Sequence, residues 1–103
     1  KIAADTYGGK TPQETLDMFI SAVEKGDYEL ASKYFVVERQ DKWKDDLVSI
    51  AKDNKLNIFL NPLKEARNNI GEYSENKKIY LINNPISVDL ILYHSNLWKI
   101  DEI

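Results

Sequence analysis

Few residues in this chain are suited to chemistry, and the single histidine is the first of them. An imidazole can act as a general base or as a metal ligand, so His94 is a candidate ligand-binding residue. It lies between Tyr93 and the pair Ser95-Asn96, which is typical of a solvated hairpin turn, and that is the simpler interpretation. There is no second histidine, no cysteine and no calcium-loop pattern of carboxylates. The sequence therefore predicts no metal site and no cofactor.

Two tryptophans and an acidic stretch are the next candidates. Trp43 and Trp98 could stack on a ligand or a nucleobase, but both lie on apolar stripes, so packing in the core is the simpler interpretation. Asp41, Asp45 and Asp46 are separated by lysines, which is typical of a solvated helix face. Neither group therefore predicts a catalytic site.

Composition excludes several classes of function. The 103 residues, 43% of them hydrophobic, are enough for one compact domain with a single core. The absence of cysteine excludes thiolate catalysis and a disulfide-stapled scaffold. Fourteen Lys and Arg against 17 Asp and Glu give a net charge of −3. Because the two signs are interleaved along the chain, we expect no nucleic-acid partner.

The beginning of the chain bears on its location. No apolar run reaches the roughly 20 residues needed to cross a bilayer, and no leader of the secretory type is present. The chain begins at Lys1 without an initiator methionine, so we expect that an upstream segment was removed. Membrane attachment is expected only through an anchor in that segment.

The helices that must position any site begin after a short arm. Residues 1–10 contain two adjacent glycines and no periodicity, and we predict a flexible arm or linker there, followed by one domain over residues 11–103. Thr11-Pro12-Gln13-Glu14 is a capping-box pattern, which predicts that the first helix begins at Pro12. Gly26 is the residue type that ends a helix in the left-handed conformation.

Further helices are expected up to about residue 69. Asp27 predicts the start of a second short helix, and apolar residues at helical spacing predict a third over residues 38–54. Residues 56–69 are also expected to be helical. Within them, Asn61-Pro62 indicates either the start of a new helix or a kink in a longer one.

After Ile70 the apolar period changes from 3.6 to 2, which predicts strands. The expected strands cover residues 79–82, 86–93 and 97–103, and turn residues separate them. Short turns between consecutive strands predict an antiparallel meander. The sequence therefore predicts an α+β domain in which N-terminal helices pack on one face of an antiparallel β-meander.

The other face of this sheet is the most interesting predicted surface. Alternation places an apolar patch there, edged by Asp89, Lys99 and Asp101, and such patches commonly mark interfaces. Two interpretations stand equally here: self-association through this outer sheet face, or a C-terminal or N-terminal segment, such as residues 2–7, that folds over it. The interface candidates are Ile91, Tyr93, Leu97 and Ile103, with Tyr80 and Ile82 as further members.

Three segments together resemble the nuclear transport factor 2-like, cystatin-like superfold. They are Thr11-Pro12-Gln13-Glu14-Thr15, the Lys25-Gly26-Asp27-Tyr28 corner followed by Leu30-Ala31, and the closing Leu97-Trp98-Lys99-Ile100-Asp101. The resemblance spans residues 11–103 and is strongest to small bacterial domains of unknown function with a closing Trp-Lys-Ile-Asp strand. It implies a strongly curved sheet that wraps around the helices as a cone, often with a pocket at the open end.

The resemblance also implies a location and possible functions. Its small bacterial members stand outside the cytoplasm behind a signal peptide or a lipid anchor, and homodimers through the sheet are frequent in the superfold. Its isomerases use a carboxylate base and a tyrosine donor. Asp89, with Tyr34, Tyr80 or Tyr93, supplies the same residue types. The simpler interpretation is that Asp89 faces away from the core and is hydrated.

We therefore expect a non-catalytic, extracytoplasmic binding or assembly module. Two alternatives remain: a domain whose pocket binds a small molecule, and an isomerase-like or dehydratase-like enzyme. The candidate ligand-binding residues are Tyr34, Tyr80, Asp89, Tyr93 and His94.

Overall fold

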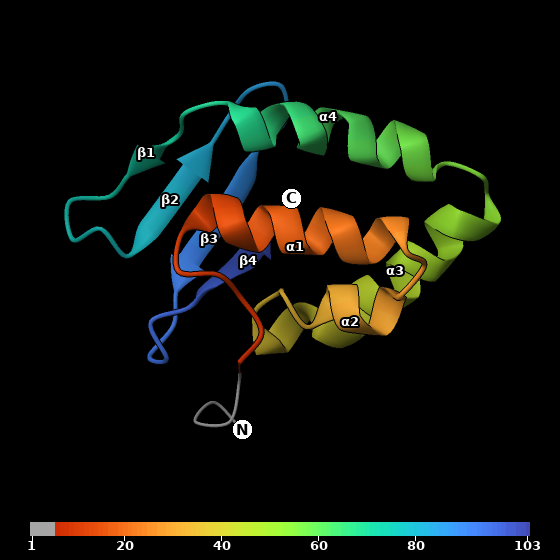
Figure 1. Cartoon of the computed structure of the whole chain (residues 1–103), viewed down its shortest axis with the longest axis horizontal. Helices are drawn as coiled ribbons and strands as arrows, with labels where there is room; N and C mark the ends of the chain where they lie inside the picture. Colours follow the sequence, from red (N-terminus) through yellow and green to blue (C-terminus); the bar gives the residue numbers. More distant parts are fainter. Residues whose placement is uncertain (1–5) are drawn as a thin grey trace.

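The computed structural model describes residues 6–103, which form helices followed by a four-stranded sheet (Figure 1). Consecutive strands pair antiparallel in the order β1-β2-β3-β4, so the predicted α+β class with a meander is confirmed. The elements are α1 (Pro12–Glu24), α2 (Tyr28–Ser32), the 3-10 turn η2 (Val37–Arg39), α3 (Gln40–Lys52), α4 (Leu56–Asn68), β1 (Glu72–Tyr73), β2 (Ile79–Ile82), β3 (Val88–Leu92) and β4 (Trp98–Glu102).

The sheet is neither closed nor strongly curled, so the cone that the resemblance implied is wrong. Its strands have only two to five residues. Strands at this short end of the usual range give the sheet too little length to wrap around the helices. Of the helices, α1 and α4 therefore lie against one face of an open sheet, while α2 and α3 pack on the other helices.

The first two helices begin where the sequence predicts. The Thr11 hydroxyl accepts a hydrogen bond from the Glu14 backbone N–H at 3.1 Å, and α1 starts at Pro12. After α1 ends, Gly26 has a φ of 79°, in the region that favours glycine. Asp27 then accepts from the Leu30 backbone N–H at 3.1 Å and caps α2.

The later elements differ from the prediction in detail. Pro62 lies inside α4, so of the two alternatives a single helix with an internal proline is correct. Strand β1 was not predicted, because two residues carry no readable alternation. Strands β3 and β4 are shorter than predicted by one or two residues at each end.

The core lies between α1, α4 and the inner face of the sheet. Phe19 of α1 packs edge-on against Phe35 with ring centroids 5.2 Å apart, and Trp43 of α3 stacks on Phe35 at 4.7 Å. Trp43 and Trp98 both belong to this packing, as the sequence predicts. The inner face of the sheet contributes Tyr80, Ile82, Val88, Leu90 and Ile100, all almost fully buried. Among residues 6–103, no helix is long and apolar enough to cross a membrane.

The described part of the predicted arm, residues 6–10, is bound to the domain. The Gly9 carbonyl accepts from the Trp98 backbone N–H at 2.9 Å, so the arm continues the hydrogen bonding at the outer edge of β4. A Cβ at Gly8 would lie 2.5 Å from the Trp98 carbonyl oxygen, which only glycine avoids. The first five residues of the predicted arm lie outside the described residues.

Candidate functional site

The outer face of the sheet, turned away from α1 and α4, carries an exposed apolar row. Ile79 and Leu81 of β2 are 40% and 39% exposed, and Ile91 of β3 pairs directly with Ile79. We call Ile79, Leu81 and Ile91 the outer apolar row. The prediction that Tyr80 and Ile82 lie here is wrong, because alternation along β2 turns their side chains into the core.

A bulge in β4 changes the predicted end of this face. Asp89 pairs with Glu102 while the next residue, Leu90, pairs with Ile100. Asp101 is therefore an extra residue in β4 with no partner of its own in β3, which is a β-bulge. The extra residue shifts the alternation that follows it. Ile103 consequently packs against the core, and its predicted place on the outer face is wrong.

A groove of about 400 Å³ lies beside the row, between η2 and strands β3 and β4. We call it the Arg39 groove. The Arg39 guanidinium bridges two carboxylates of β4, with Nε 3.5 Å from Asp101 and Nη2 3.0 Å from Glu102. The Tyr93 hydroxyl accepts from the Val37 backbone N–H at 2.9 Å, which fixes the ring. The groove is lined by Val36, Glu38, Arg39, Ile91, Tyr93 and Asp101.

Lys99, on the outer face beside the groove, is fully buried. Its ammonium donates to the Lys33 carbonyl at 2.6 Å, which supplies a polar partner for the buried charge. It also lies 5.9 Å from the Tyr7 ring centroid and 5.7 Å from that of Tyr93, within the range of cation–π contacts. The arm and the segment after α2 thus close over this end of β4.

Asp89 lies on the same face, where it interacts electrostatically with Asp101 and Glu102 at the end of β4. Its partial burial raises the pKa of this carboxyl, and the negative charges of Asp101 and Glu102 raise it further. None of the salt bridges among residues 6–103 includes Asp89. Four carboxylates, of Glu38, Asp89, Asp101 and Glu102, therefore lie near the groove, against two cationic groups, the Arg39 guanidinium and the buried Lys99 ammonium.

The other candidate ligand-binding residues do not join this site. Tyr80 is buried on the inner side, where its hydroxyl accepts from Gln13 Nε2 at 2.8 Å and from the Gly71 backbone N–H at 2.6 Å. Tyr34 packs edge-on against Tyr7, and burial is the main cause that raises the pKa of its hydroxyl. His94 is exposed in the turn between β3 and β4, as its neighbours predict.

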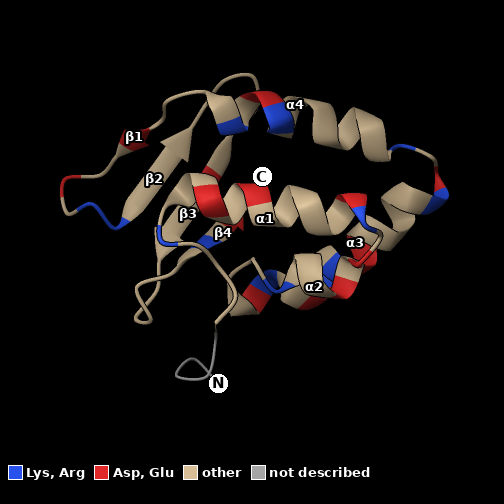
Figure 2. Cartoon of the chain, viewed as in Figure 1, with Lys and Arg blue, Asp and Glu red and all other residues tan. Residues whose placement is uncertain are grey.

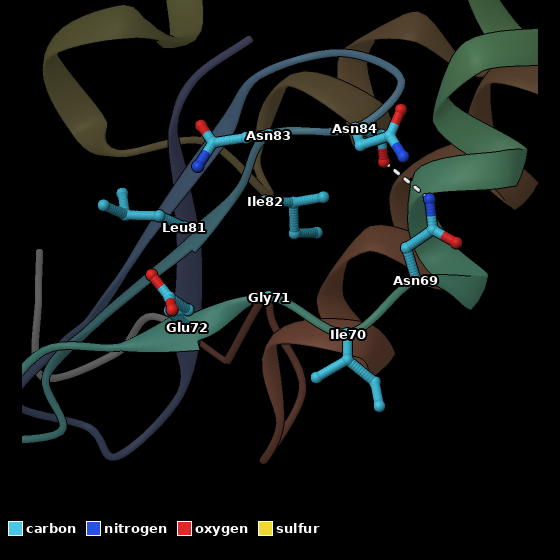
Figure 3. A pocket seen from close by; sticks show the side chains of 8 residues that line it. All are labelled: Asn69, Ile70, Gly71, Glu72, Leu81, Ile82, Asn83 and Asn84. Carbon is cyan, nitrogen blue, oxygen red and sulfur yellow. Dashed lines mark hydrogen bonds between the residues drawn. The ribbon is translucent and has the colours of Figure 1, made fainter.

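A second cleft, of about 410 Å³, lies where α4 ends and the chain enters β1 (Figure 3). The Asn69 side-chain amide donates to the Asn84 carbonyl at 2.6 Å across one end of it. Glu72 is the only ionisable side chain in its lining, so this cleft does not present an acid–base pair. The lining consists of Asn69, Ile70, Gly71, Glu72, Leu81, Ile82, Asn83 and Asn84.

Arg39 is the residue of the site that sequence reasoning missed, whereas Lys99 and Asp101 were predicted only as part of the charged edge of the outer patch. Alternation places Lys99 and Asp101 on the outer face, but nothing in the sequence places Arg39 opposite them. The contact of η2 with β4 is set by the tertiary fold: the Val36 backbone N–H donates to the Ile100 carbonyl at 2.9 Å, at the edge of β4.

The chain matches no family model, no curated protein and no solved structure. The resemblance to the nuclear transport factor 2-like superfold therefore stays a prediction, and the site is interpreted from its own geometry.

Proposed function

We propose that this domain is a non-catalytic binding and assembly module that pairs with a second copy of itself through the outer face of β2 and β3. The observation that carries the proposal is the outer apolar row. Exposed apolar side chains that adjoin one another and are edged by charge are typical of protein interfaces. Ile79 and Leu81 adjoin in this way on the face opposite α1 and α4.

The charges at the two ends of β2 support a second copy as the partner. Glu72 pairs with Leu81 at one end, and Lys77 and Lys78 outnumber Glu75 at the other. Figure 2 shows β1 in red and the chain entering β2 in blue. When two copies stack face to face with their β2 strands antiparallel, each basic end lies over the acidic end of the other copy. A twofold interface is self-complementary in this sense.

The test is the oligomeric state of the chain, measured by sedimentation equilibrium over a range of concentrations. We expect a reversible dimer in the wild-type chain. Leu81→Lys places a charge in the apolar row and should weaken dimerisation by about tenfold or more. Ile58→Lys is the matched control, because Ile58 is 70% exposed on α4, away from this face. A wild-type monomer at high micromolar concentration would contradict the proposal.

We further propose an extracytoplasmic location for this module, and the resemblance alone supports that proposal. Fractionation of cells that make the full-length protein tests it. Recovery in the cytoplasmic fraction would contradict it.

A further inference from the structure

We infer that the Arg39 groove binds a basic side chain, lysine or arginine, presented by an extended segment of a second protein. This inference goes beyond the proposed self-association, because the occupant is a different protein and the groove lies toward β4, sharing only Ile91 with the outer apolar row. It stands on the shape of the groove, its apolar floor and its excess of negative charge.

The floor of the groove suits the aliphatic part of a basic side chain. Ile91 is half-buried, so part of its apolar surface is open to the groove, while Val36 in the lining is only 4% exposed and adds little. The Tyr93 ring forms one wall and is held in place by the hydrogen bond from Val37. Lysine and arginine bury their methylene stems on such surfaces while their charged heads remain at a polar rim.

The charge on the rim favours a cation. Arg39 is engaged with Asp101 and Glu102. Two more carboxylates, Glu38 in the lining and Asp89 on the adjoining strand, take part in none of the salt bridges that residues 6–103 form. Lys99 lies beneath this face with its ammonium on the Lys33 carbonyl. An incoming basic side chain would therefore meet two carboxylates that form no salt bridge within residues 6–103.

Other classes of ligand fit the groove less well. An anion would have to displace the two carboxylates from Arg39, which is the only cationic side chain in the lining. Among the described residues there is no group of three His, Cys, Asp or Glu side chains placed to hold a metal ion. An organic cation with an apolar stem matches both the floor and the rim.

The experiment is a titration of the 15N-labelled full chain with a blocked pentapeptide that has one arginine between two valines. It is run in the Leu81→Lys background, so that self-association does not interfere. We expect chemical-shift changes centred on the amides of Val37, Arg39, Ile91 and Asp101. The same peptide with glutamine in place of arginine should shift them far less.

A pair of charge-neutralising variants completes the test. Glu38→Gln with Asp89→Asn should weaken binding of the arginine peptide by about fivefold, because two ion pairs with the peptide, one exposed and one partly buried, are lost. Glu65→Gln with Asp53→Asn changes the net charge equally at exposed sites on or beside α4 and should leave binding unchanged. Equal binding of the glutamine peptide, equal loss in both double variants, or equal shifts of the same amides by Mg²⁺ alone would overturn the inference. A wild-type monomer would leave it intact, which separates it from the proposed function.

Discussion

At the scale of single residues, the Asp89 carboxyl makes the stability of the folded chain depend on pH. Partial burial and then the charges of Asp101 and Glu102 raise its pKa in the folded chain. Between the ordinary aspartate pKa and this raised value, the folded state holds more protons than the unfolded state, so stability falls as the pH rises through that window. We therefore expect Asp89→Asn to be more stable than the wild type at neutral pH. The advantage should disappear below the ordinary aspartate pKa, where Asp89 is protonated in both states.

Urea unfolding at a series of pH values measures this difference. Asp41→Asn is a suitable control, because Asp41 is exposed at the start of α3 and takes part in none of the salt bridges of the described residues. The free energy of unfolding of this variant should not rise relative to the wild type in the same pH-dependent way. An Asp89→Asn variant that is less stable than the wild type at neutral pH would show that a favourable partner holds the carboxylate.

Lys99 illustrates what the sequence predicts at this scale and what it does not. Alternation along the last strand places Lys99 on the outer face. In the structure Lys99 pairs with Ile91 of that face, a register that alternation alone does not give. Its complete burial could not be predicted, because the covering groups are Tyr7 and the Lys33 carbonyl, which come from distant parts of the chain. Only the tertiary fold brings those segments to β4.

At the scale of elements, the short strand β1 depends on a glycine. A Cβ at Gly71 would lie 2.3 Å from the Leu81 carbonyl oxygen and 2.8 Å from the Tyr80 ring. The carbonyl belongs to β2, which is paired on both sides, so it cannot move away without disturbing that pairing. We expect Gly71→Ala to lower the free energy of unfolding by about 2–3 kcal/mol, as overpacking does. Amide hydrogen exchange at Glu72 and Tyr73 should also accelerate, because β1 would be displaced.

Gly26→Ala separates this effect from the general cost of replacing a glycine. Gly26 has a positive φ, but no atom lies within 4 Å of a Cβ built there, so only backbone strain of about 1 kcal/mol is expected. Exchange in β1 should not change. If both variants lost the same free energy and left β1 protected, the close approach at Gly71 would not be the cause.

Local signals decide which elements the sequence predicts. The helix starts at Pro12 and after Asp27 are correct, because each is fixed by a cap within four residues. Strand β1 was missed because its two residues are held by Gly71 and by pairing with β2, neither of which is a local pattern. The bulge that turns Ile103 inward was missed for the same reason: alternation assumes that no residue is inserted.

At the scale of the whole molecule, the two edges of the sheet are unequal. Along β4, hydrogen bonds join Trp98 to Gly9 and join Ile100 to Tyr34 and Val36, so this edge is occupied. The opposite edge is the two-residue strand β1, which offers little length for pairing with another chain. Assembly through the edges is therefore disfavoured in comparison with the outer face. The unequal edges favour stacking of outer faces over strand addition in the proposed dimer.

At the β4 edge, the Thr15 hydroxyl links three segments of the chain: the arm, α1 and β4. Thr15 Oγ1 accepts from the Gly9 backbone N–H at 2.9 Å and donates to the Trp98 carbonyl at 3.0 Å, and Thr15 is fully buried. Thr15→Val keeps the shape but leaves a buried N–H and a buried carbonyl without this partner, which should cost about 1–3 kcal/mol. Thr15→Ser keeps the hydroxyl and should cost less. Urea unfolding gives both values, and hydrogen exchange of the Gly9 and Trp98 amides should accelerate only in the valine variant. If valine were tolerated as well as serine, the arm would be held at β4 by its backbone contacts alone.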